Sequence, residues 1–312
     1  MSAKATHMDL LIELAVTGAL SGVKVGISAL GFAIIFYATK EMHFAFGAIS
    51  VAAAYICNWV VMSIAGPVGV MIALAAAFAF ATLLSVAIHK FVYQRLRSVM
   101  PVVMASLGIS LLVENIVQMI GSPDTQVLVY DNLLQVVDFG FVRVRALELW
   151  IAALFIAISF GLDFFLNRTR IGQGFAATIE DPEMAELVGI RTARMRIGAY
   201  CAGAALGTLS GLSMLIDTGL RPSQGFVMLL YALIITIMGR GSFRAVAIWA
   251  VLFGLLRSVW SWKFPTEFQE LAMFAVMMGY LIGRDAWDRY KRNRLTSLPT
   301  AASAPSAVLG GA

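Results

Sequence analysis

Long apolar runs alternate with short polar segments along almost the whole chain. A helix needs about 20 apolar residues to cross a bilayer, and nine runs come near or above that length. One run, 225–238, is too short for a straight crossing, so we expect a short or broken span there, with a re-entrant segment as the alternative. The nine expected spans are residues 10–38, 47–64, 68–92, 101–121, 148–166, 198–216, 225–238, 245–262 and 268–282.

The longest polar interruption in the second half of the chain is Arg168–Ile190. Asp181 is a favourable N-cap, and Pro182 follows at the first helical position, where its missing N–H costs nothing. Gly189 can adopt the left-handed conformation that ends a helix. We therefore predict a short helix of about two turns inside a loop that spans residues 167–197.

This short helix has two different sides. Glu183 and Glu186 favour its positive N-terminal end, whereas Met184, Leu187 and Val188 form an apolar side. An isolated helix of this length is not stable in water, so its apolar side needs a cover. The cover is either another part of the chain or a partner.

Composition places most of the chain in lipid. Apolar residues make up 60% of the sequence, only 13% are charged, and the mean hydropathy is +0.84. We expect an all-α polytopic membrane protein with about 8–10 transmembrane helices. Residues 1–295 would form one transmembrane domain, and residues 296–312 a disordered tail rich in small residues.

The net charge of +5 does not indicate nucleic-acid binding, because the basic residues lie at the ends of apolar runs. With the 167–197 loop on the cytoplasmic side, sixteen Lys and Arg residues lie inside and five lie outside, and positive charge is retained in the cytoplasm. The N-terminus then faces out and the C-terminus faces the cytoplasm. The five outside residues are Lys4, Arg143, Arg145, Arg221 and Lys263.

Two of the expected spans carry glycine at every fourth position, a spacing that lets another helix approach closely. The two helices run in opposite directions in this topology, and their sequences GALSGVKVGISAL and GAALGTLSGLSML share six identities in thirteen positions. The pattern fits an inverted repeat, although glycine-rich helices also match by chance. The helix-packing glycines are Gly18, Gly22, Gly26, Gly203, Gly207 and Gly211.

No motif for catalysis occurs in the sequence. A GxxxxGK[ST] phosphate-binding loop is absent, so the chain does not itself bind ATP. The three histidines, His7, His43 and His89, are dispersed, which indicates neither a catalytic constellation nor a metal site. Cys57 and Cys201 both lie in apolar runs and are expected as free thiols. We expect a protein that is not an enzyme, with no catalytic residue, no metal and no cofactor of its own.

Ionisable groups inside spans are costly and usually face a cavity or a partner. Glu114, with Asn115 beside it and Gln118 one turn later, either lines a solute path or packs between helices. Lys24 lies opposite the glycines of the first span. It either faces a cavity on the path or pairs with a carboxylate such as Glu114 or Asp217.

Other ionisable residues lie nearer the span ends, where an interfacial position explains them. Asp163, Asp217 and Arg257 belong to this group. Trp59 and Trp150 fit the outer membrane interface.

The stretch TRIGQGFAATIEDPEMAELVGI resembles the cytoplasmic loop of permease subunits of branched-chain amino-acid ABC transporters. In that family a T-R-x-G opening, an alanine-rich run and a D-x-E-x-A-x-x-x-G-I segment occur together. ALGFAIIFYATKEMHFAFGAISVAAAY and PVVMASLGISLLVENIVQMIGSP resemble other parts of the family, and the likeness covers most of Leu10–Asp285. The matching loop residues are Thr169, Arg170, Gly172, Ala176, Ala177, Asp181, Glu183, Ala185, Gly189 and Ile190.

The chain departs from the family pattern at three positions near the presumed path. Lys24 replaces an apolar or aromatic residue, Phe46 replaces a polar residue before Gly47, and Glu114 replaces a glutamine. The family also includes permeases for urea, short amides and aromatic acids. The transported solute therefore stays open among these and the branched-chain amino acids.

The resemblance implies an importer permease of the bacterial inner membrane that works with other subunits. These are a second homologous permease, two ATP-binding subunits that hold ATP and Mg, and a periplasmic or extracytoplasmic solute-binding protein. The loop helix would couple the permease to the ATPase through Asp181, Pro182, Glu183, Met184, Ala185, Leu187, Val188 and Gly189.

The sequence leaves two further classes of protein as alternatives. A secondary transporter driven by an ion gradient would use Glu114 or Asp217 as its coupling site, but it leaves the capped loop helix unexplained. A pore or structural scaffold would need a ring-like or filter motif, which the sequence lacks.

Overall fold

The structure is a computed structural model of the 312-residue chain. It describes residues 2–64, 66–96, 98–121, 125, 136–138, 143–217, 219–265 and 268–296. The predicted tail 296–312 lies outside these residues except for Thr296. The chain divides into two compact units, residues 1–264 and 265–312, which are described separately.

Seven helices among the described residues are long and apolar enough to cross a membrane, which agrees with an all-α polytopic membrane protein. Six of them are α2 to α5, α8 and α10, and the seventh is the part of α1 from Ile12 onward. Their bounds are α1 Ser2–Thr39, α2 Ala45–Ser63, α3 Pro67–Phe91, α4 Val99–Gly121, α5 Ala146–Arg168, α8 Thr192–Asp217 and α10 Phe243–Lys263.

The remaining elements are shorter or more polar. A 3₁₀ turn, η1 (Tyr93–Arg95), follows α3, and the helices α6 (Arg170–Glu180) and α7 (Pro182–Leu187) lie between α5 and α8. In the second unit, α11 (Gln269–Thr296) covers the predicted ninth span except for its first residue, but α11 is not among the seven apolar helices.

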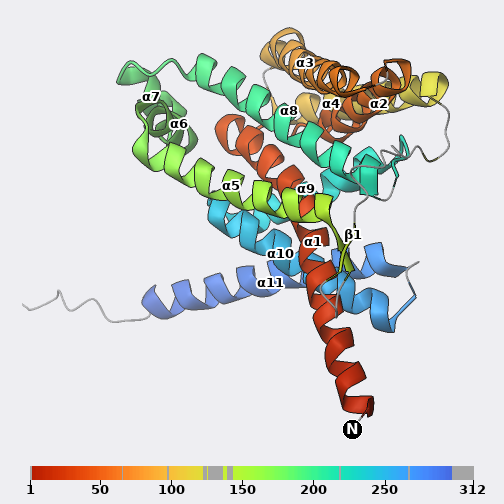
Figure 1. The fold of residues 1–312 in the computed structure, drawn as a ribbon. Coiled ribbons are helices and arrows are strands. Elements are labelled where there is room, and N and C mark those ends of the chain that lie inside the picture. Colours follow the sequence, from red (N-terminus) through yellow and green to blue (C-terminus); the bar gives the residue numbers. More distant parts are fainter. Residues whose placement is uncertain are drawn as a thin grey trace, which may run out of the picture. The chain divides into compact units, whose positions relative to one another are not determined.

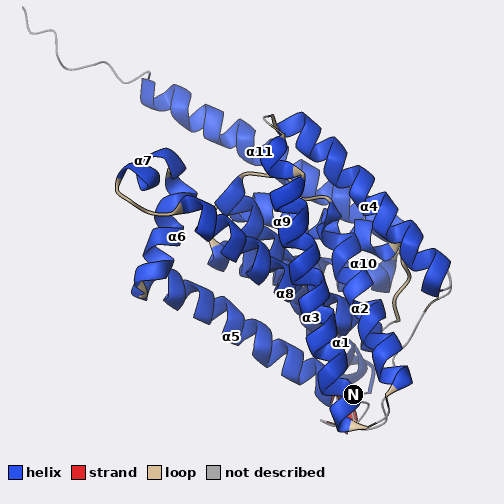
Figure 2. Cartoon of the chain, turned by 90° about the horizontal axis from the view of Figure 1, so that it is seen from above, coloured by secondary structure: helices blue, strands red, loops and turns tan. Residues whose placement is uncertain are grey.

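Two short strands precede α5 that the sequence pattern did not predict. β1 (Val136–Asp138) pairs with β2 (Arg143–Arg145) in an antiparallel hairpin, in which Val137 lies opposite Val144. The hairpin leads directly into α5, whose other end leads to α6 and α7 (Figure 2). We call the two ends of the first unit the hairpin end and the α7 end.

The core of the first unit is built from α1, α2 and α8, around which α3, α4, α5 and α10 leave much of their surface exposed. In Figure 1, α1 runs through the bundle between α5, α8 and α10. The most buried helices are rich in glycine, alanine and serine, which let backbones approach closely. The exposed helices carry large apolar side chains on their outer faces, as lipid or a partner helix requires.

The six glycines predicted to pack helices all lie at close helix–helix contacts, where an added Cβ would come within 3.0 Å of another atom. The first three meet α10 or α5: a Cβ on Gly22, for example, would lie 2.6 Å from the Ala250 carbonyl oxygen. The others meet α1 and α2: a Cβ on Gly211 would lie 2.6 Å from the Ser50 carbonyl oxygen. Larger residues at these positions would push the core helices apart.

The doubtful seventh span is a continuous helix, α9 (Gln224–Gly239). Its 16 residues extend about 24 Å, less than the ~30 Å hydrocarbon core of a bilayer. It is held inside the bundle, because the Tyr37 hydroxyl donates to the Thr236 carbonyl oxygen and the Thr236 hydroxyl donates to the Ala29 carbonyl oxygen. The segment is therefore a short helix without a break, and its crossing of the membrane stays a prediction.

Candidate functional site

The segment between α5 and α8 is more ordered than the sequence pattern predicted. We expected one short helix in a polar loop, but residues 170–180 also form a helix, α6. Thr169 interrupts α5 and caps α6, since its hydroxyl accepts a hydrogen bond of 2.9 Å from the Gly172 N–H. Gly172 lies against the Phe165 carbonyl, where a Cβ would collide. The sequence TRIG thus builds a tight corner between two helices.

The caps of α7 are as predicted. The Asp181 carboxylate accepts hydrogen bonds from the N–H groups of Glu183 (3.0 Å) and Met184 (3.1 Å). Pro182 is the first helical residue, and Gly189 has the left-handed φ of 87° that ends the helix. The Ile190 N–H then donates to the Ala185 carbonyl oxygen over 3.0 Å. α7 is therefore a capped unit held at both ends.

The apolar side of α7 is not covered by the part of the chain that the structure describes. Met184, Leu187 and Val188 are 62%, 81% and 76% exposed, whereas Ala185 is buried. Glu183 and Glu186 are also exposed, and the Glu186 carboxylate accepts a hydrogen bond from the Thr192 hydroxyl at the start of α8. An exposed apolar patch beside carboxylates is typical of a surface that docks a partner.

Four charged side chains meet at the hairpin end, and we call them the charge cluster: Lys24, Arg145, Glu148 and Asp217. The Lys24 ammonium contacts the Glu148 carboxylate at 2.8 Å and also pairs with Asp217. Arg145 contacts the other Asp217 oxygen at 3.0 Å. The side chains of Lys24, Glu148 and Asp217 are only 12–18% exposed, so both carboxylates are matched by cations in a part-buried position.

The charge cluster joins three helices and one strand. Lys24 comes from the middle of α1, Glu148 from the first turn of α5, Asp217 from the end of α8 and Arg145 from β2. Pairing of Lys24 with Asp217 was one of the two alternatives that the sequence left open, and the structure selects it. Asp217 is therefore a partner of two cations rather than a solvated residue at the membrane interface.

A second polar group lies near the α7 end, and we call it the histidine–tyrosine cluster: Glu41, His43, His89, Tyr93 and Tyr200. The Tyr200 hydroxyl donates to the Glu41 carboxylate over 2.7 Å, and His43 Nδ1 lies 2.6 Å from the Tyr93 hydroxyl. His89 stacks on the Tyr200 ring at 4.5 Å between centroids, and its Nδ1 lies 3.4 Å from the Glu41 carboxylate.

Both histidines are almost completely buried. Burial, with the neighbouring His89 as a smaller cause, lowers the pKa of His43 to about 3, so this residue is neutral at pH 7. No contact between the histidines was predicted from their dispersed positions, and the structure brings His43 and His89 together at Tyr200. Their meeting depends on the α1–α2 connection, α3 and α8 lying together, which no local spacing reveals.

The polar residues of α4 form a separate group. The Gln118 amide donates to the Glu114 carboxylate over 3.3 Å, and Asn115 is exposed, with its amide on the Leu111 carbonyl oxygen. α4 packs chiefly against α2, whereas Lys24 pairs with residues outside α4. The structure therefore does not bring Lys24 to the other three residues proposed for the path. Across the described residues, no group of three or more His, Cys, Asp or Glu has the geometry of a metal site.

The chain is similar to known permease proteins over most of its length. Residues 14–281 match the family described as "Branched-chain amino acid transport system / permease component". The permease protein BraD of a high-affinity branched-chain amino acid transport system in Pseudomonas aeruginosa is 24% identical over 287 residues, covering 86% of this chain and 92% of BraD. The corresponding permease LivH of Escherichia coli is 22% identical over 281 residues, covering 85% and 91%.

A solved structure has a similar fold. A chain of PsaBC from Streptococcus pneumoniae in complex with Fab aligns with a TM-score of 0.50 and 12% identity, over 84% of this chain and 89% of that chain. At this level of identity the likeness concerns the fold alone.

Proposed function

Because the chain belongs to the branched-chain amino acid transport system / permease component family, we propose that it is the membrane-spanning permease of an ATP-binding-cassette importer. Separate subunits would hydrolyse the ATP, a second homologous permease would complete the membrane part, and a solute-binding protein would deliver the solute. The observation that carries this proposal is α7, a capped helix whose apolar side is exposed at one end of the bundle.

In this proposal α7 couples the permease to the ATPase. Leu187 and Val188 would insert into the ATPase surface, while Ala185 keeps α7 attached to its own chain. α7 follows α6, which starts at the capped corner where α5 ends, and it is tied to α8 through the Glu186–Thr192 hydrogen bond. A displacement of α7 would therefore move two membrane helices. Work is transmitted only if α7 makes different contacts in the two states of the ATPase.

The distribution of Lys and Arg supports an orientation with the α7 end in the cytoplasm and the N-terminus outside. The chain would then lie in the bacterial inner membrane with the charge cluster toward the outer side. The binding protein would act from that side.

The solute path, in the same proposal, runs along the polar face of α4. Glu114, Asn115 and Gln118 lie on a helix with little covered surface, and polar groups do not favour lipid. The second permease would cover this face and enclose the path. Lys24 would act indirectly, by holding α1, α5 and α8 together at the outer end. The solute class is branched-chain amino acids or a related small solute such as urea, an amide or an aromatic acid.

Two substitutions with the same charge test the coupling role. We expect Leu187→Glu, on the exposed side of α7, to abolish copurification with the ATPase subunit and ATP-dependent uptake in vesicles. Gln173→Glu, at an exposed position of α6, is the matched control and should retain both. If Leu187→Glu leaves both measurements unchanged, α7 is not the docking element.

The alternative is a secondary transporter with Glu114 or Asp217 as its coupling site. The structure disfavours Asp217 in that role, because its carboxylate is already shared by Lys24 and Arg145. Uptake by the reconstituted chain alone, driven by a proton gradient without ATP, would establish this alternative. Uptake that requires both ATP and the ATPase subunits would exclude it.

A further inference from the structure

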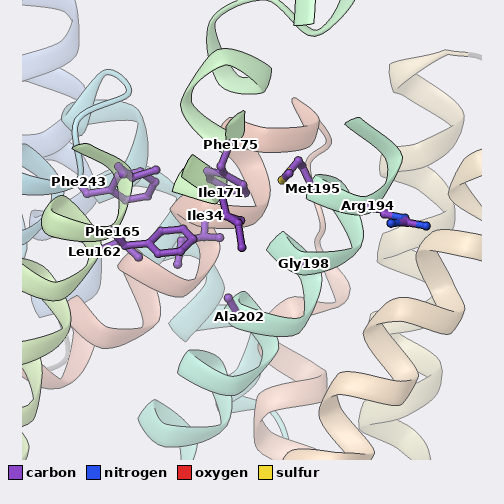
Figure 3. Close-up of a pocket in the computed structure, with 11 residues that line it drawn as sticks. Ile34, Leu162, Phe165, Ile171, Phe175, Arg194, Met195, Gly198, Ala202 and Phe243 are labelled. Atoms are coloured by element: carbon purple, nitrogen blue, oxygen red, sulfur yellow. The ribbon is translucent and has the colours of Figure 1, made fainter. Parts of the chain in front are cut away.

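A cavity of about 350 Å³ lies near the α7 end, apart from the charge cluster, the histidine–tyrosine cluster and the polar face of α4. Its walls come from α1, α5, α6, α8 and the first residue of α10 (Figure 3). The side chains of Ile34, Phe165, Ile171 and Phe175 point toward one another in this view. At Gly198 an added Cβ would meet no atom within 4 Å, so the space beside α8 is open.

The walls of this cavity exclude a polar solute. Arg194 is the one lining residue that carries a charge or a polar side-chain group, and every other lining residue is apolar or glycine. A buried polar molecule without hydrogen-bond partners is strongly disfavoured, and an apolar cavity does not hold ordered water. The ligand that fits such walls is a hydrocarbon group.

The cavity lies next to helices with large exposed apolar surfaces, which membrane lipid surrounds.

One arginine, Arg194, lies among the residues that line the cavity. Arg194 is exposed on α8, and Figure 3 shows its guanidinium directed away from the apolar side chains. Arg168 and Arg170 flank the corner between α5 and α6, beside the lining residues Leu166 and Ile171. Within the part of the chain that the structure describes, none of these three arginines forms an ion pair. An apolar cavity lined by one arginine that has no ion pair among the described residues is complementary to an anionic amphiphile.

We propose that this cavity binds one acyl chain of an anionic phospholipid, with the phosphate at Arg194. The proposal does not depend on the transport function or on the ATPase. Bound there, the lipid would fill the space between α5, α6 and α8, the helices that carry α7. Basic pockets between membrane helices are known to recognise anionic lipid headgroups.

The test uses the full chain in phosphatidylcholine vesicles that contain phosphatidylglycerol with a photoactivatable diazirine on its acyl chain. We expect crosslinks concentrated on residues 162–175 and 195–202. Gly198→Leu would fill the open space and reduce this crosslinking about tenfold, as expected when at least two methylenes lose their buried position. Gly161→Leu is the matched control, because Gly161 is also open and exposed but does not line the cavity.

The headgroup is tested with Arg194→Gln. We expect the preference for the phosphatidylglycerol probe over a phosphatidylcholine probe with the same chain to fall about fivefold, and Arg194→Lys to restore it. Crosslinks spread evenly over the exposed faces of α3 and α4, or an unchanged signal in Gly198→Leu, would overturn the proposal. Equal labelling by both probes would show that the cavity binds hydrocarbon chains without recognising the headgroup. This result would overturn the proposal that the phosphate of an anionic lipid binds at Arg194.

Discussion

The two buried polar clusters of the first unit use opposite chemistry at opposite ends. The charge cluster pairs Lys24 and Arg145 with Glu148 and Asp217, whereas the histidine–tyrosine cluster stacks two rings and has a neutral His43 at its centre. The charge cluster joins α8 to α1. The histidine–tyrosine cluster joins α8 to the connection that follows α1.

The difference matters because ion pairs and packed rings respond differently to separation. A pair of opposite charges can part when water or other charges replace the partner, but a part-buried charge left alone is strongly destabilising. Stacked rings in a dry core have close-packed neighbours on every side and lose them together. We therefore expect the hairpin end to be the end that opens and the histidine–tyrosine cluster to stay closed.

The largest effect is expected from Lys24→Met. This change leaves Glu148 and Asp217 without their shared cation and should destabilise the folded protein by about 3–5 kcal/mol. Thermal unfolding of the detergent-purified chain measures it. Lys24→Arg, which keeps the charge, should reduce the stability of the folded protein much less. Combining Lys24→Met with Asp217→Asn should recover part of the stability that Lys24→Met loses. Equal stability of Lys24→Met and the parent chain would show that the ion pairs do not hold this end.

A smaller loss is expected at the other end from Tyr200→Phe. The change keeps the ring on His89 but removes the hydrogen bond to the Glu41 carboxylate, which is worth about 1.5–3 kcal/mol. The same unfolding measurement applies. Equal stability of Tyr200→Phe and the parent chain would contradict this contribution.

The histidine–tyrosine cluster should also make stability depend on pH. His43 has a pKa of about 3 in the folded chain and an ordinary value of about 6.5 when unfolded, so the unfolded chain binds more protons between these values. Its contribution to stability is complete above pH 6.5 and falls as the pH decreases, by about 2 kcal/mol between pH 7 and pH 5. The groups around it are His89, Tyr93, Tyr200 and Glu41.

The matching variant for this prediction is His43→Gln. Unfolding temperatures are measured from pH 5 to pH 7. Their increase with pH should be smaller in His43→Gln than in the parent chain, and unchanged in Lys24→Met. An identical slope in His43→Gln and the parent chain would contradict a neutral buried His43.

The smallest effect is expected from Arg145→Gln. The Arg145 side chain is 39% exposed, so its pair with Asp217 is screened by solvent and should contribute about 1 kcal/mol or less. Lys24 would still neutralise Asp217. A loss as large as that of Lys24→Met would mean that the two cations contribute equally to the cluster.

Local sequence determined the elements that depend on neighbours along the chain. The apolar runs predicted the membrane helices, because length and hydropathy are properties of a continuous segment. Asp181, Pro182 and Gly189 predicted both ends of α7, because a cap bonds to residues two or three positions away. α6 was missed although Ile171, Phe175 and Ile179 recur at every fourth position, as on an amphipathic helix, because the glycines at 172 and 174 lower its helix propensity.

Only the tertiary structure decided which distant residues meet. Lys24 had two alternatives in the sequence, and the packing of α1 against α5 and α8 selected Asp217 and added Glu148. The meeting of His43 and His89 at Tyr200 needed three elements brought together, and the apolar cavity beside Gly198 needed five. The physical reason is that burial and charge pairing depend on contacts between helices, and these contacts are set by the whole bundle rather than by any one segment.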